Sequence, residues 1–167
     1  MKISTDEIIE MLQSYRSKKR MIEQLKFELE NPSQITAEEL LRAMSIGNSE
    51  FASVHSGGVS DKTMSIVAHY SDITSRLNLE TLDQIKRELR MLVGETSKLE
   101  LYVSLLDENY ENVIRLRDFE GKTWSEIETA LKSTERRLRE RRKAAIEELS
   151  NMYGFVDAFK EKSTEEG

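Results

Sequence analysis

Apolar residues recur every three or four positions along most of this chain, a spacing that places them on one face of an α-helix. The first run follows Ser4 and Glu7, which have the spacing of a capping box, and it predicts a helix of about 25 residues ending near Pro32. Thr36 and Glu39 repeat that spacing and predict a helix of about two turns. Because Ala, Glu, Lys, Leu and Arg are abundant, we expect an all-α fold without strands.

The longest apolar pattern lies in the middle of the chain and consists of two stripes that are displaced by about one residue near positions 78–81. One helix of about 40 residues with a stutter, or two helices that meet there, would produce it. Such a helix must pack on the first helix, on its copy in a second chain, or on both, and we expect a homodimer. The stripes are Ile66, Tyr70, Ile73 and Leu77, then Leu82, Ile85, Leu89, Leu92, Leu99, Val103 and Leu106.

The composition excludes several kinds of site. The chain has no cysteine, which excludes disulfides, cysteine-ligated zinc and thiol chemistry, and His55 and His69 cannot complete a histidine-rich metal site. Neither a Gly-rich phosphate loop nor a nucleophile elbow is present, so we expect no enzyme, no metal and no cofactor. The stretch 45–62 contains Gly57 and Gly58 among serines and predicts a flexible linker.

No apolar run approaches the roughly 20 residues that a membrane-spanning helix needs. Asp6, Glu7 and Glu10 lie where a signal peptide needs an apolar stretch. We therefore expect a soluble, cytoplasmic protein that makes no contact with a membrane.

Positive charge is concentrated in residues 132–143, which contain seven basic and two acidic side chains in a chain of net charge −6. A basic helix on an acidic protein is either a solvated face or a surface for a polyanion, usually nucleic acid. The preceding residues favour the second interpretation. Thr123 and Glu126 form a third capping box, Lys132 and Ser133 form a tight connection, and Thr134 can cap the next helix, which together predict a helix-turn-helix.

The stretch 110–149, YENVIRLRDFEGKTWSEIETALKSTERRLRERRKAAIEEL, is similar to sigma-factor region 4 and, more closely, to the C-terminal half of phage late-gene transcription activators of the RinA/ArpU type. The resemblance implies a long N-terminal helical arm, a C-terminal helix-turn-helix that binds promoter DNA, and activation of late genes with the host RNA polymerase. The matching residues are Leu116, Arg117, Lys122, Thr123, Trp124, Glu126, Ile127, Thr134, Arg136, Leu138 and Ala145.

Helical geometry indicates which side chains would contact double-stranded DNA. With Leu138 facing inward, Ala145 and Leu149 also face inward, and the basic residues lie on the outer face and its flanks. Arg136 and Arg137 are in the first turn, where they would contact base edges, and Glu140 could accept a hydrogen bond from cytosine. The side chains better placed for phosphates are Lys122, Thr123, Arg139 and Lys143. Trp124 is interpreted as a core residue.

Glu128 departs from the family pattern, which usually has alanine at this position between the two helices. A lone carboxylate there would lose its hydration, so we expect it to pair with Arg142 or, failing that, with Arg141. The alternative is that Glu128 is rotated to the solvent edge.

The sequence thus predicts three regions: a helical dimerisation arm over residues 1–107, a helix-turn-helix over 108–153 and a tail over 154–167. We expect a phage-type transcriptional regulator. A helical structural or adaptor protein whose basic helix binds an acidic protein partner is the alternative, and salt-sensitive binding to duplex DNA separates the two. A full sigma factor fits less well, because the N-terminal half lacks an aromatic-rich segment for promoter melting.

Overall fold

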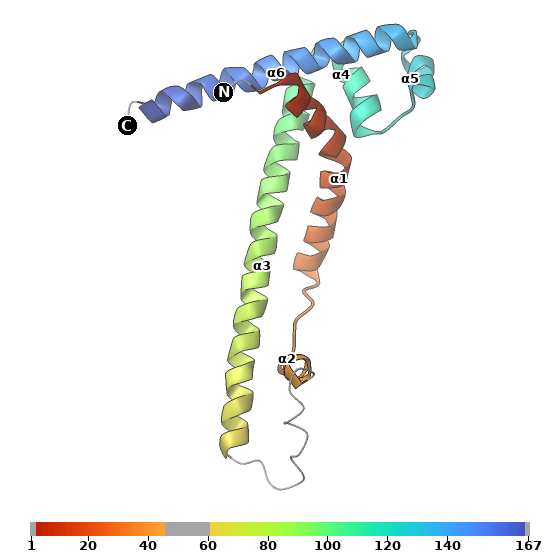
Figure 1. Ribbon diagram of the computed structural model, residues 1–167. Helices are drawn as coiled ribbons and strands as arrows, with labels where there is room; N and C mark the ends of the chain where they lie inside the picture. The colour runs from red at the N-terminus through yellow and green to blue at the C-terminus, as the bar shows by residue number, and fades with distance from the viewer. Residues whose placement is uncertain (1–2, 46–60, 166–167) are drawn as a thin grey trace. The chain divides into compact units, whose positions relative to one another are not determined.

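The computed structural model describes residues 3–45 and 61–165, and within them every regular element is a helix (Figure 1). The fold is all-α, as predicted. Most of the predicted linker, 45–62, lies outside the described residues. The elements are α1 (Thr5–Glu30), α2 (Ala37–Ser45), α3 (Asp61–Ser104), α4 (Glu108–Ile114), a π-helical turn (Arg115–Phe119), α5 (Trp124–Leu131) and α6 (Glu135–Glu165).

All three predicted capping boxes are present. At the start of α1, the Ser4 hydroxyl accepts a hydrogen bond from the Glu7 N–H at 3.2 Å, and the Glu7 carboxylate accepts one from the Ser4 N–H at 2.7 Å. The same reciprocal pair joins Thr36 and Glu39 at the start of α2. Each pair satisfies two backbone donors that the first helical turn leaves without a partner, so the helix starts were predictable from local sequence.

Helix α3 is one continuous helix of 44 residues, so the predicted single long helix is present and the alternative of two helices that meet near positions 78–81 is wrong. Helix α6 is also longer than predicted. It continues through Glu165, so residues 154–165, which were expected to form a tail, extend the same helix. Phe155 on this extension is 67% exposed.

The contacts divide the chain into two units, Met1–Glu23 with Met91–Gly167, and Gln24–Arg90. We call them the terminal unit and the middle unit. The prediction had placed the first 107 residues together in one arm. The start of α1 instead belongs to the terminal unit, with the segment that was predicted to be the helix-turn-helix.

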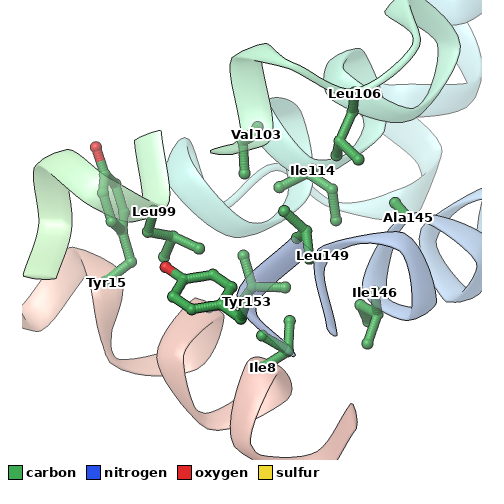
Figure 2. Close-up of a cluster of buried hydrophobic side chains, with 11 residues drawn as sticks. Ile8, Tyr15, Leu99, Val103, Leu106, Ile114, Ala145, Ile146, Leu149 and Tyr153 are labelled. Atoms are coloured by element: carbon green, nitrogen blue, oxygen red, sulfur yellow. The ribbon is translucent and has the colours of Figure 1, made fainter. Parts of the chain in front are cut away.

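The core of the terminal unit brings together three helices that are far apart in sequence. Ile8 and Leu12 of α1, Leu99 and Val103 of α3, and Leu149 of α6 are all buried in it, and Figure 2 shows most of this cluster. Covering of apolar surface of this kind is the main favourable contribution to folding. The C-terminal part of the predicted α3 stripe is therefore covered within the chain. A second chain is not required to bury it.

Polar contacts also connect α1 with α3 in the terminal unit. The Tyr15 hydroxyl donates to the Glu100 carboxylate at 2.5 Å, and Lys19 pairs with the same carboxylate at 3.1 Å. Burial and this hydrogen bond raise the pKa of Tyr15 well above its usual range. The Tyr15 ring stacks on Phe119, with 3.9 Å between the ring centroids. Tyr15 thus links α1 to α3 and to the π-helical turn.

In the middle unit, Asn78 of α3 holds the extended segment before α2. Its side-chain amide donates to the Ile35 carbonyl and accepts from the Ile35 N–H, both at 3.1 Å. The side-chain amide of Asn78 thus pairs with Ile35 as a strand residue would, and it satisfies both the backbone N–H and the carbonyl of Ile35. Farther along α3, Leu82, Ile85 and Leu89 are only half-buried.

Candidate nucleic-acid interface

The segment before α5 is fixed by Gly121. Its φ of +72° lies in the left-handed region, and the next residue, Lys122, donates its N–H to the Leu116 carbonyl at 2.9 Å. The Arg16 guanidinium of α1 occupies the space in which a β-carbon on residue 121 would lie. The left-handed backbone conformation therefore requires glycine here, whereas the Arg16 guanidinium, at the end of a flexible side chain, could move aside.

Thr123 begins α5 as its N-cap residue. Its hydroxyl accepts a hydrogen bond from the Glu126 N–H at 3.3 Å, and the Glu126 carboxylate accepts one from the Thr123 N–H at 2.7 Å. The backbone hydrogen bond from Thr123 lowers the pKa of Glu126. The Thr123 side chain, which we predicted to contact phosphate, is thus already used to cap the helix. Lys122, directly before it, is exposed.

Helices α5 and α6 are connected by three residues, Lys132 to Thr134. Lys132 has φ 50° and ψ 46°, a left-handed conformation that ends α5. Thr134 lies at the N-cap position of α6, but the side-chain oxygen that accepts a hydrogen bond there belongs to Glu128. Its Oε1 lies 2.6 Å from the Glu135 backbone nitrogen.

The predicted pairing of Glu128 with Arg142 is therefore wrong. The carboxylate of Glu128 is directed to the first N–H of α6, where the partial positive charge of the helix N-terminus also stabilises it. Glu128 keeps part of its surface exposed, while its carboxylate bonds to the backbone of α6. An acceptor was needed because the left-handed turn brings the end of α5 close to the start of α6.

Arg142 instead forms a two-point ion pair with Asp118 of the π-helical turn. Its Nε and Nη2 atoms lie 2.9 and 2.7 Å from the two carboxylate oxygens. The Asp118 side chain is 7% exposed and that of Arg142 is 22% exposed, so the pair is largely withdrawn from water. Arg142 is therefore a structural residue, although for another reason than the predicted one. The sequence gives no sign of the contact, because its partners are 24 residues apart.

A small apolar cluster joins α4, α5 and α6 beside the Glu128 and Arg142 contacts. Val113 of α4, Ile127 of α5 and Leu138 of α6 are fully buried, and Trp124 packs against them while partly exposed. The inward positions predicted for α6 are confirmed, because Leu138, Ala145 and Leu149 have no exposed surface. The opposite face of α6 is accordingly turned to solvent.

The predicted contact residues of α6 lie on that solvent face. Arg136 is 89% exposed and pairs with Glu140 one turn later at 3.3 Å. Arg139 pairs with Glu135 at 2.6 Å. Exposed pairs of this kind contribute little to stability and exchange readily for other partners. Arg137 and Lys143 are exposed, and in the described part of the chain neither forms an ion pair with a carboxylate.

Trp124 brings together two basic side chains from different elements. The guanidinium carbons of Arg117 and Arg139 lie over its ring, 4.9 and 4.8 Å from the centroid. Arg117 also donates to the Lys122 carbonyl at 2.8 Å. Arg117 lies among the residues that carry the family resemblance, but no role is predicted for it from the sequence. The signal that identifies it is the cation–π contact, which depends on the fold.

Trp124 and Arg139 also line a cleft of about 290 Å³ between the start of α1 and α6. Lys143 and the structural Arg142 contribute to the same lining. Of the predicted residues, the structure thus brings Arg139 and Lys143 together beside the start of α5. Arg136, Arg137 and Glu140 lie outside this cleft.

No family model, curated protein or solved structure matches this chain. Among residues 3–45 and 61–165, no helix is both long and apolar enough to cross a membrane. In the same ranges no group of three or more acidic, histidine or cysteine side chains could hold a metal ion.

Proposed function

We propose that the chain is a DNA-binding transcriptional regulator in which residues 108–153 form a helix-turn-helix and the first turns of α6 enter the major groove of duplex DNA. The observation that carries the proposal is the connection between α5 and α6. Three residues, one in a left-handed conformation, join a short capped helix to a long one whose first N–H is held by Glu128. Short helix, tight turn and long basic helix are the parts of this motif.

The exposed side chains support separate roles in that proposal. Arg136 and Arg137, in the first turn of α6, are free of buried contacts and can present their guanidinium groups to base edges. Arg139, Lys143 and Lys122 are assigned to the phosphates, which supply affinity without sequence information. Arg117 joins this group because it is held beside Arg139 on the ring of Trp124. Thr123 supports the phosphate contacts indirectly, because it caps the start of α5 next to Lys122.

Self-association through α3 is part of the same proposal. Leu82, Ile85 and Leu89 are spaced by three and four residues and are only half-buried in the middle unit. Two copies related by a two-fold axis would present two α6 helices to half-sites about 34 Å apart or a multiple of it. The resemblance to late-gene activators adds host RNA polymerase as the protein partner in this proposal.

The test is equilibrium binding of the full chain to labelled duplex fragments of its source genome, followed by fluorescence anisotropy at several salt concentrations. If about six phosphates are contacted, the logarithm of the association constant falls with the logarithm of salt with a slope near −5. The expected result is one tightly bound fragment among many weakly bound ones. Absence of binding to every fragment at low salt would remove the proposal and favour the adaptor alternative, in which the basic face binds an acidic protein.

A further inference from the structure

A second cleft, of about 230 Å³, lies in the terminal unit between α1, α3 and α6, apart from the residues proposed to contact DNA. Its apolar lining includes Met11, Leu99 and Tyr153, and three charged side chains, Lys18, Glu95 and Lys98, contribute to it. Tyr153 belongs to the buried cluster of Figure 2, so the floor of the cleft is the core itself. A concave apolar site with a few convergent polar groups is the usual form of a small-molecule site. We call it the tyrosine–lysine cleft.

Lys98 is the side chain whose surroundings are unusual. Its ammonium nitrogen lies 4.6 Å from the ring centroid of Tyr153 and 5.4 Å from that of Tyr102. The two rings meet edge to face, with 4.6 Å between their centroids. Two aromatic rings attract a cation, but they supply no negative charge to neutralise it.

The carboxylate closest along the helix is already engaged. Glu95, one turn before Lys98 on α3, pairs with Lys18 of α1 at 2.8 Å. In the described residues, no carboxylate lies within ion-pair distance of the Lys98 ammonium. Of the two lysines in the lining, Lys18 is paired with a carboxylate, and Lys98 has none within ion-pair distance in the described part of the chain. The positive charge of Lys98 therefore lies beside apolar walls without a matching negative charge.

The tyrosines add a hydrogen-bond donor. Burial raises the pKa of Tyr153 to about 12, so its phenol keeps its proton at physiological pH and can donate to an anion. The Tyr15 hydroxyl is not available in this way, because it donates to Glu100. The cleft thus combines the Lys18–Glu95 ion pair, the further cation of Lys98, one neutral phenol and an apolar surface.

We propose that the tyrosine–lysine cleft binds a small amphipathic carboxylate, whose anion pairs with Lys98 and whose apolar body lies against Met11, Leu99 and Tyr153. The volume corresponds to roughly eight water molecules at about 30 Å³ each, which admits a short fatty acid. A carboxylate is favoured over a neutral ligand because only an anion matches the charge of Lys98. This site goes beyond the proposed DNA-binding function and does not depend on it.

The test uses octanoate as the probe and octan-1-ol as its neutral counterpart, with the full chain and isothermal titration calorimetry. We expect saturable binding of octanoate and at least tenfold weaker binding of octanol. Lys98→Met keeps the aliphatic stem and removes the charge, so it should weaken octanoate binding at least tenfold and leave octanol binding unchanged. Lys98→Arg should restore most of the affinity. Lys86→Met, which removes an exposed lysine of the middle unit, is the matched control.

Equal affinity for octanoate and octanol, or equal binding by Lys98→Met and Lys86→Met, would overturn the proposal. Circular dichroism checks that each variant is folded. A measurement on the unaltered chain makes the test independent of variants. Nuclear Overhauser effects are expected between octanoate methylenes and both the ring protons of Tyr153 and the methyl group of Met11, and their absence at saturating octanoate also overturns the proposal. Because no DNA is present, failure here leaves the DNA-binding proposal intact.

Discussion

The carboxylate of Glu128, near the end of α5, accepts a hydrogen bond from the backbone N–H of Glu135, the first residue of α6, at 2.6 Å. This bond spans the turn and fixes the direction in which α6 leaves it. Both residues carry negative charge, and Glu135 in turn holds Arg139 at 2.6 Å. The first residue of α6 thus contacts the preceding helix through its backbone and an exposed arginine of α6 through its side chain.

Glu128→Ala should lower the free energy of unfolding by about 1 kcal/mol, because the first N–H of α6 would lose a charged acceptor in a half-buried position. Urea denaturation followed by circular dichroism measures the change. Glu120→Ala, at an exposed position before α5, is the control and should change stability by less than about 0.5 kcal/mol. Equal stabilities of the two variants would show that the bond is unimportant in solution.

Arg142→Ala should destabilise the protein by about 3 kcal/mol, because Asp118 would be left with a buried and unpaired charge. Asp118→Asn should cost less, since the amide remains a hydrogen-bond acceptor for the arginine. A double-mutant cycle with alanine at both positions should give a coupling above about 1 kcal/mol. A coupling near zero would mean that the two side chains separate in solution, and Arg142 would then return to the candidates for DNA contact.

The raised pKa of Tyr153 predicts a loss of stability at high pH. The pKa is about 12 in the folded chain against about 10 in an unfolded one, so the contribution of the protonated phenol is complete below pH 10 and is lost between pH 10 and 12. The loss should amount to about 2 kcal/mol. It is measured as the fall of the urea midpoint from pH 9 to 11.5. Tyr153→Phe should show a smaller fall, and an equal fall in both would assign the effect to other groups.

The DNA-binding proposal predicts different effects for two sets of α6 residues. Arg136→Ala with Arg137→Ala should reduce the preference for the specific fragment by about 1–3 kcal/mol per lost base contact. Lys143→Ala should weaken all fragments alike and make the salt slope shallower by about one. Arg87→Ala removes an exposed cation of the middle unit and serves as the control. Uniform weakening by every variant would indicate that α6 makes no base contacts.

The dimer proposal is tested at Leu82 and Leu89, two half-buried positions of α3. Leu82→Asp with Leu89→Asp should convert a dimer into a monomer in sedimentation equilibrium, because a buried interface would have to hold two carboxylates per chain. Gln84→Asp with Arg90→Asp changes exposed residues and should leave the dimer intact. A monomer for the unaltered chain at tens of micromolar would refute the proposal directly.

The features that the sequence predicted are those with local causes. Ser4, Thr36 and Thr123 each bond to a residue three positions later, and the period of the apolar residues reports helix faces directly. Contacts between distant segments could not be predicted. Arg142 has four carboxylates within seven residues in sequence, yet it pairs with Asp118, because the π-helical turn directs that side chain inward. The predicted partner of Glu128, Arg142, is wrong because helical periodicity places side chains only and says nothing of the free backbone N–H groups at the start of α6.

The core of the terminal unit also has a consequence for synthesis on the ribosome. Ile8 and Leu12 emerge from the ribosome well before their neighbour Leu149, and the Ser150 hydroxyl donates to the Ile3 carbonyl across 147 residues. At about 5–20 residues per second, the apolar face of α1 is without its partner on α6 for roughly 7–30 s. Until Leu149 has been synthesised, the nascent chain therefore exposes the part of the apolar face of α1 that α6 covers in the folded protein. The yield of folding should depend on holdase chaperones that cover this surface.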